Sequence, residues 1–367
     1  MQTNRRYWLK QIGLGFAGVG LANFKTIASP TEDIFDFNPD DAPIKLSSNE
    51  NPYGPSSMAK TAMVKNVNIS NRYNWQLTSE LIDNLAKKNN VTSDNILMGA
   101  GSTEILDLVA RFAALEKGNL IIADPSYDYW TGAAQKLGLK KITVPVTSDK
   151  KLDLPAMLKA ITSDTKLIYV CNPNNPTGTI CDRTELLDFI NEATKKAMVL
   201  VDEAYIDFTP QQSLSTLAVK NKNLVVAKTF SKIYGLAGAR VGYAIGNDQT
   251  LNQLSELQSW ANGSISVAST AAAIASLQDK KFVADTYSLN EKTRQFTNQQ
   301  FEKLNLHYIP SYSNFVYFSL TNYNKDFFEQ LKTNKISGTR IYEEQGKWTR
   351  ITVGTMKEMQ KFFSAIV

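Results

Sequence analysis

The sequence predicts an α/β fold, in which a large domain with a mostly parallel sheet covered by helices is followed by a smaller α+β domain. Three observations predict it. Between about residues 79 and 244, short β-rich runs alternate with segments of helical periodicity, which is typical of right-handed crossovers and a parallel sheet. After Asn247 the pattern changes to long helices followed by short strands. A chain of 367 residues, 43% of them hydrophobic, is long enough to bury two such cores.

The elements follow one another in a regular order. In the large domain we expect helices at 79–88, 102–115, 127–136 and 183–193, and strands at 95–98, 119–123, 141–144, 166–170, 198–201, 223–227 and 240–244. In the small domain we expect helices at 249–260, 267–278, 280–304 and 357–365, and strands around 314–319, 338–342 and 350–353. The predicted division is a leader at 1–28, an arm at 29–56 that joins the small domain, the large domain at 57–248 and the small domain at 249–367. Ligand groups are expected in the loops that follow the parallel strands.

The net charge of +5 is concentrated at the start of the chain. The first 30 residues carry four Lys or Arg and no acid, so the remaining charge is about +1. A nearly neutral body argues against a nucleic-acid-binding surface. The paired Arg5 and Arg6, before a short charge-free run that ends at Phe24, resemble a twin-arginine export signal that is too short to span a bilayer comfortably. The alternative is an amphipathic arm that packs on a partner subunit.

Cysteine and histidine are too scarce for several kinds of site. Cys171 and Cys181 are the only cysteines and His307 is the only histidine. Two cysteines cannot make a disulfide framework or a metal cluster, and one histidine excludes a polyhistidine metal site. A catalytic triad based on His307 is not expected either, because this residue precedes a predicted strand of the small domain. We therefore expect no metal.

The expected site is centred on residues 229–242, TFSKIYGLAGARVG. Lys232 follows the strand at 223–227 and is the candidate Schiff-base lysine. An amine is nucleophilic only when neutral, so burial or neighbouring positive charge must lower its pKa. Arg240 could supply that charge while its planar fork grips a phosphate. On this stretch alone, an ordinary surface combination of Ser-Lys with a later Arg is the stronger alternative.

Two earlier strands also end in groups that suit a phosphate-bearing cofactor. The strand at 95–98 is followed by GAGSTE, in which Ser102 and Thr103 open a helix whose free amides and dipole would hold a phosphate. The alternative is a plain capping box. After the next strand, Tyr127 at a predicted helix start could stack on a flat heterocycle, although a core tyrosine is the simpler interpretation.

The next two strand ends are more specific. The run CNPNNPTG at 171–178 fixes a rigid loop in which the Asn175 amide can donate to a phenolate oxygen. The run DEAY then sets Asp202 at a strand tip with Tyr205 three residues later. An ionised Asp202 against a pyridine nitrogen would keep that nitrogen protonated and make the ring an electron sink. The alternative for DEAY is a helix start with an acid that complements the dipole.

These motifs, in this order and each after a strand, resemble the class I/II aminotransferases that depend on pyridoxal phosphate and share the aspartate aminotransferase fold, which is fold type I. The opening run LSSNENPYGP at 46–55 and the closing run RITVGT at 350–355 are similar to the histidinol-phosphate aminotransferase branch. The resemblance covers nearly everything from about Leu46 to the C-terminus.

The resemblance implies a role for each matching residue. Lys232 would form the Schiff base, Asp202 would pair with the pyridine nitrogen, Asn175 and Tyr205 would bond the ring oxygen, and Tyr127 would stack on the ring. Ser102, Thr103, Thr229, Ser231 and Arg240 would hold the phosphate, joined by Tyr53 from the neighbouring subunit of a homodimer. Arg350 would clamp a substrate carboxylate, with Arg340 and Asn175 close to the substrate.

The expected reaction moves an amino group between an L-amino acid or amine, histidinol-phosphate-like or aromatic, and a 2-oxo acid such as 2-oxoglutarate. The alternatives are a decarboxylase, lyase or racemase of the same fold, and a non-catalytic pyridoxal-phosphate-binding sensor. The sequence departs from the branch in an acidic segment at 34–41, at Asn74 and Trp75, and at 336–340. All three departures could border the substrate, so the resemblance defines the cofactor more closely than the substrate.

Overall fold

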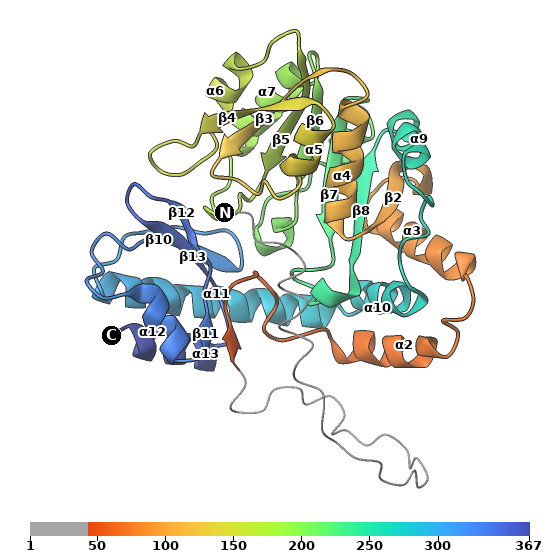
Figure 1. Cartoon of the computed structure of the whole chain (residues 1–367). Coiled ribbons are helices and arrows are strands. Elements are labelled where there is room, and N and C mark those ends of the chain that lie inside the picture. The colour runs from red at the N-terminus through yellow and green to blue at the C-terminus, as the bar shows by residue number, and fades with distance from the viewer. Residues whose placement is uncertain (1–42) are drawn as a thin grey trace, which may run out of the picture. The chain divides into compact units, whose positions relative to one another are not determined.

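The computed structural model describes residues 43–367 (Figure 1). The predicted leader and the acidic segment lie outside the described residues. The helices are α2 (Ser57–Val67), α3 (Trp75–Asn89), α4 (Ser102–Ala113), α5 (Thr131–Lys136), α6 (Leu154–Lys159), α7 (Arg183–Ala193), α8 (Ser215–Ala218), α9 (Asp248–Glu256), α10 (Val267–Gln278), α11 (Lys280–Lys303), α12 (Phe327–Thr333) and α13 (Met356–Ile366). The strands are β1 (Ile44–Lys45), β2 (Ile96–Ala100), β3 (Gly118–Asp124), β4 (Leu139–Pro145), β5 (Thr165–Cys171), β6 (Met198–Asp202), β7 (Leu224–Thr229), β8 (Val241–Gly246), β9 (Tyr308–Ile309), β10 (Phe315–Ser319), β11 (Ile336–Ser337), β12 (Ile341–Glu343) and β13 (Trp348–Thr352).

The main sheet has seven strands in the order β2-β8-β7-β6-β5-β3-β4. Its neighbouring pairs are parallel except for the two that involve β8, which runs antiparallel to both neighbours. The predicted mostly parallel sheet is therefore confirmed. The carboxyl ends of β5, β6 and β7 lie side by side, with Cys171 paired to Asp202 and Asp202 paired to Ala227.

Helices cover both faces of this sheet. Because successive side chains of a strand point to opposite faces, β6 contributes to two separate cores. Val199 and Val201 pack in the core that includes residues of α3, α7 and α10, whereas Met198 and Leu200 pack in the core that includes α4, α5 and α9. A strand buried on both faces is apolar throughout, which explains why β6 shows no alternation of polar and apolar residues.

A second, antiparallel sheet has the order β12-β13-β10-β9 and is drawn in blue in Figure 1. It packs against α11, α12 and α13 through a core that includes Phe301, Phe318 and Phe362. Near it, β1 pairs in parallel with β11, with Ile44 opposite Ile336. The first described strand is thus hydrogen-bonded to a strand from the C-terminal third of the chain.

The structure places α9 and α10 against the main sheet, although both follow the predicted boundary at 248/249. Leu251 and Leu254 of α9 belong to one core of that sheet, and Ala272 of α10 belongs to the other. A helical pattern shows that a helix has an apolar face but not which sheet that face meets. The predicted domain boundaries stay predictions.

Several helices differ from expectation: α5 begins later than predicted, α3 begins earlier, and α2, α6, α8 and α12 were not predicted. We expected a helix from Tyr127, but α5 begins only at Thr131, so Tyr127 lies in the loop between β3 and α5. Helix α2 was not predicted, because Ala59 is its one fully buried residue and no apolar stripe marks it in the sequence. Between residues 43 and 367, the structure contains no helix whose length and apolar character would let it cross a membrane.

Candidate active site

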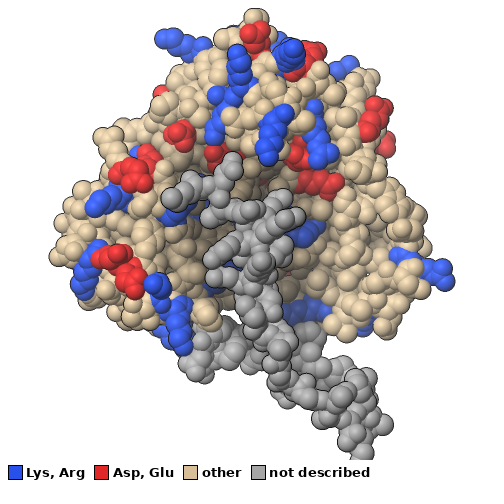
Figure 2. Space-filling view, viewed as in Figure 1, with Lys and Arg blue, Asp and Glu red and all other residues tan. Residues whose placement is uncertain are grey.

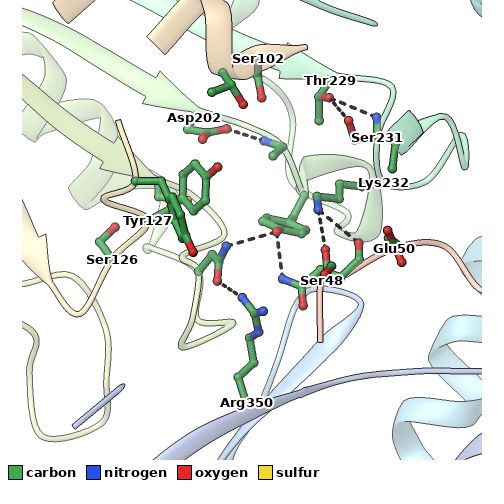
Figure 3. Close-up of a pocket in the computed structure, with 18 of the residues that line it drawn as sticks. Ser48, Glu50, Ser102, Ser126, Tyr127, Asp202, Thr229, Ser231, Lys232 and Arg350 are labelled. Carbon is green, nitrogen blue, oxygen red and sulfur yellow. Dashed lines mark hydrogen bonds between the residues drawn. The ribbon is translucent and has the colours of Figure 1, made fainter. Parts of the chain in front are cut away.

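A cavity of about 610 Å³ lies at the carboxyl ends of the main-sheet strands and opens between the main sheet and the second sheet (Figure 3). Twelve of the thirteen site residues expected from sequence line it. They are Ser102, Thr103, Tyr127, Asn175, Asp202, Tyr205, Thr229, Ser231, Lys232, Arg240, Arg340 and Arg350. Segments more than 200 residues apart in the sequence therefore meet in one cavity.

Lys232 lies in the loop after β7 and is half-buried because the cavity opens onto it. Its Nζ donates to the backbone carbonyls of Ser48, at 3.3 Å, and Asn49, at 3.2 Å. Burial, with the positive charge of Arg350 as the next cause, lowers the pKa of Lys232 to about 8. A substantial fraction of this amine is thus neutral near physiological pH, which is what an attack on an aldehyde requires.

Asp202 is the last residue of β6 and is 3% exposed. Each of its carboxylate oxygens accepts one hydrogen bond: Oδ2 from the Tyr169 hydroxyl at 2.9 Å and Oδ1 from the Ala204 amide at 3.0 Å. Burial raises the pKa of Asp202 to about 6, while these two donors act in the opposite direction. Sequence reasoning missed Tyr169, because a tyrosine within an apolar strand looks like an ordinary core residue.

The phenol of Tyr205 is held by two amides. Its oxygen accepts from Asn175 Nδ2 at 3.3 Å and from Asn49 Nδ2 at 3.0 Å. Asn49 adopts a left-handed backbone conformation with φ of 54°. Its backbone N–H donates to Thr352 Oγ1 at 2.9 Å. The motif NENP contained Asn49, and the left-handed tolerance of asparagine was the signal that could have singled it out.

A ring of donors forms the end of the cavity near α4. Ser102 begins α4, and the Arg240 Nη1 atom lies 3.4 Å from Ser231 Oγ. A Cβ atom added to Gly101, whose φ is +79°, would lie 2.2 Å from Arg240 Nη2, and one added to Gly242 would lie 2.2 Å from the Ser102 amide nitrogen. Only glycines allow the backbone and the guanidinium to come this close. Hydroxyls, a guanidinium and a helix N-terminus in one place suit a phosphate.

The opposite end of the cavity holds Arg350 of β13. Its guanidinium donates to the Asn175 side-chain oxygen and to the Ser47 carbonyl, the latter at 2.6 Å. Its Nε is buried without a hydrogen-bond partner in the described part of the chain. A buried donor without a partner is costly unless a ligand satisfies it, so this atom indicates an anionic ligand group such as a carboxylate.

Arg340 and Tyr127 line the cavity, whereas Tyr53 does not. The Arg340 guanidinium stacks on the Tyr342 ring, with 5.2 Å to the centroid. The Tyr127 ring lies 6.0 Å from that of Tyr129, and burial raises its pKa. Tyr53 is instead half-buried away from the cavity, and burial raises its pKa.

These features suit pyridoxal phosphate: a lysine of low pKa, an aspartate at the end of the neighbouring strand, amides that hold a phenol, and a set of phosphate-binding donors. Such a set on this α/β scaffold defines a pyridoxal-phosphate-dependent enzyme of fold type I. The family model for aminotransferase class I and II matches residues 41–366. The chain therefore belongs to the class I and II aminotransferases, in the histidinol-phosphate aminotransferase-like branch, and is a transaminase that uses pyridoxal phosphate.

Named relatives place it in this branch. A histidinol-phosphate aminotransferase of Moorella thermoacetica is 34% identical over 328 residues, which are 88% of this chain and 84% of that protein. The crystal structure of a putative histidinol-phosphate aminotransferase from Erwinia carotovora atroseptica is 31% identical, with a TM-score of 0.83 over 88% of this chain and 95% of the other. The Sinorhizobium meliloti histidinol-phosphate aminotransferase, solved with pyridoxal-5'-phosphate, is 24% identical with a TM-score of 0.79 over 88% of this chain and 89% of that one, and shows the same fold. The comparisons do not favour a decarboxylase, lyase, racemase or sensor.

Proposed function

We propose that this transaminase exchanges an amino group between a 2-oxo acid such as 2-oxoglutarate and an L-amino acid or amine that is histidinol-phosphate-like or aromatic. The observation that carries this proposal is the pair of arginines in one cavity. Arg350 presents a buried, unpartnered Nε. Arg340 lines the same cavity, and its guanidinium lies over the Tyr342 ring. Two cations suit the two carboxylates of 2-oxoglutarate, and one of them can hold the single anionic group of a histidinol-phosphate-like or aromatic donor.

The residues divide the chemical work. When bound, pyridoxal phosphate supplies an aldehyde and an electron-withdrawing ring. Lys232 would hold that aldehyde, and its pKa of about 8 would let the amine take a proton from the substrate α-carbon as a base and give one back as an acid. Asp202 holds a proton on the ring nitrogen, and Asn175 and Tyr205 orient the ring oxygen. Arg350 orients the substrate carboxylate.

The remaining residues of the cavity bind the phosphate and the ring of the cofactor. Ser102, Thr103, Thr229, Ser231 and Arg240 hold the phosphate, and Tyr127 stacks on the ring. We also propose a homodimer with shared sites, in which Tyr53 reaches the partner's phosphate, because Tyr53 lies away from the cavity of its own chain. Mixing Tyr53→Phe and Lys232→Ala chains tests this point: some mixed dimers would hold one intact site, so the mixture should regain activity that neither variant has alone.

The surface charge supports small-molecule substrates. Figure 2 shows Lys and Arg interspersed with Asp and Glu on the face in view, outside the area that the grey atoms cover. No nucleic-acid partner is proposed for the enzyme. Export through a twin-arginine signal remains our proposal from the paired Arg5 and Arg6; replacing both by Lys should retain the protein in the cytoplasm, and unchanged fractionation would contradict it.

An absorbance spectrum of the purified protein tests the reaction directly. The band of the bound cofactor should move to the ultraviolet with glutamate and return with 2-oxoglutarate, because only a transaminase stores the amino group on the cofactor. A panel of histidinol phosphate, phenylalanine, tyrosine and aspartate then ranks the donors. Arg340→Gln should lose turnover for donors with an anionic side group by about 10-fold or more, while phenylalanine changes little. A band that never moves would contradict transamination.

A further inference from the structure

Tyr169 lies beneath the site, in β5, and reaches Asp202 from the neighbouring strand. Its hydroxyl donates to Asp202 Oδ2 at 2.9 Å, and the residue is 1% exposed. The Ala204 amide occupies the other oxygen at 3.0 Å. With one donor on each oxygen, the carboxylate is fixed in rotation, and its remaining lone pairs are available toward the cavity that Asp202 lines.

The Tyr169 ring cannot easily move away. It packs edge-to-face on Trp130, with 5.0 Å between centroids and 61° between planes, and belongs to the same core as Leu120 and Leu200. Burial, followed by the charge of Asp202, raises the pKa of Tyr169 well above its ordinary value. The phenol therefore stays protonated and acts only as a donor.

Other charged or titratable groups also act on Asp202. Lys232 lowers the pKa of Asp202, and Glu203 raises it. Cys171 and Tyr127 face it as neutral groups, since burial raises the pKa of each. Among the described residues, Tyr169 is the side chain that makes a direct hydrogen bond to Asp202.

We propose that Tyr169 is a positioning residue that keeps Asp202 ionised and aimed at the ring nitrogen of the cofactor. The inference rests on the proposed role of Asp202 and adds a residue that acts through it. Without the phenol, the carboxylate loses a donor that stabilises its anion and becomes more basic. The proton shared with the ring nitrogen then shifts toward Asp202, and the ring withdraws electrons less well.

The test replaces Tyr169 by Phe, which keeps the ring and removes the hydroxyl. Tyr243→Phe is the matched control, because Tyr243 is also buried, at 3% exposed, its hydroxyl accepts a hydrogen bond from Asn89 Nδ2, and it lies outside the cavity. Three quantities are measured on the full chain: the dissociation constant of pyridoxal phosphate, the kcat and KM for the amino donor, and the titration midpoint of the Asp202 carboxyl. The last is read from infrared difference spectra against Asp202→Asn in protein freed of cofactor.

For Tyr169→Phe we expect the dissociation constant to rise on the order of 10-fold or more. We also expect kcat to fall by a similar factor with the donor KM within about two-fold, and the Asp202 midpoint to move upward. Tyr243→Phe should change none of these. If both variants behave alike, the inference is overturned and Tyr169 is a packing residue only. If the wild type binds no pyridoxal phosphate, the proposed site roles fail as well, and the infrared midpoint separates the two failures because it needs no cofactor.

Discussion

Asn175 accepts a hydrogen bond from Arg350 through its side-chain oxygen and donates one to the Tyr205 hydroxyl, at 3.3 Å, through its side-chain nitrogen. One amide therefore connects the expected carboxylate-binding arginine to the phenol beside the cofactor ring. The two contacts also fix the orientation of the amide, since its oxygen must face Arg350. The substrate end and the ring end of the cavity are thus held in one hydrogen-bonded chain (Figure 3).

Replacing Arg350 by Met should impair both substrate binding and the reactivity of Lys232. We expect kcat/KM for glutamate to fall about 100-fold, because a two-point contact with a carboxylate is lost. Arg350 also lowers the pKa of Lys232, so the pKa of Lys232 should rise in this variant. Steady-state kinetics measure the first effect. Arg350→Lys is the matched control: it should restore the Lys232 pKa but not the carboxylate affinity, and equal recovery of both would contradict the bidentate role.

Replacing Lys232 by Ala should abolish the covalent attachment of the cofactor. The visible band should disappear and turnover should fall by at least about 1,000-fold, while equilibrium dialysis should still detect noncovalent binding by the phosphate cradle. Lys222→Ala, at an exposed position in the loop before β7, is the control and should retain both band and activity. A Lys232→Ala protein that still turned over would refute the assignment.

The pKa of Lys232 sets a pH dependence. Burial lowers this pKa to about 8, so below pH 8 most of the amine is protonated and cannot attack an aldehyde. The rate at which cofactor-free protein combines with pyridoxal phosphate should rise about 10-fold per pH unit below 8 and level off above it. Stopped-flow absorbance measures this rate. A profile that is flat from pH 6.5 to 9.5 would show that the amine is not the titrating group.

Asp202 should make the cofactor-free protein less stable as the pH rises. Burial raises its folded-state pKa from 3.8 to about 6, so between these values the unfolded chain binds fewer protons than the folded one. The free energy of unfolding should therefore fall as pH rises from about 4 to 6. The contribution of Asp202 to this fall is on the order of 3 kcal/mol. Denaturant titrations of Asp202→Asn should lack this part of the slope. Adding pyridoxal phosphate to the wild-type protein should offset this loss of stability. Identical stability–pH profiles for the wild type and Asp202→Asn would contradict the prediction.

Gly101 should be needed for the phosphate cradle. Gly101→Ala places a Cβ atom 2.2 Å from Arg240 Nη2 at a φ of +79°, so the guanidinium must shift and cofactor affinity should drop about 10-fold or more. Gly132→Ala is the control, because nothing lies within 4 Å of its Cβ position in α5, and it should be neutral. Isothermal titration with pyridoxal phosphate distinguishes them; equal affinities would show that the cradle tolerates the displacement.

The main sheet could be predicted because its signals are local. A buried strand such as β6 reads as an apolar run, and each strand end carries its own polar motif, so Asp202 and Lys232 could be placed without knowing the sheet order. The antiparallel direction of β8 could not be predicted, because strand direction depends on which strand lies beside it. The helix start was misplaced at Tyr127 for a related reason: the loop that carries this ring into the cavity has no periodic signal.

Periodicity and short motifs act over a few residues, so the amino-acid sequence is enough to predict the α/β class, the cofactor chemistry and the residues at the strand ends. Only the tertiary structure showed that Asn49 donates to Tyr205, 156 residues away, that Arg350 bonds Asn175 across 175 residues, and that Tyr169 supports Asp202. Such contacts arise when distant segments pack together, and no local pattern records which side chains then meet.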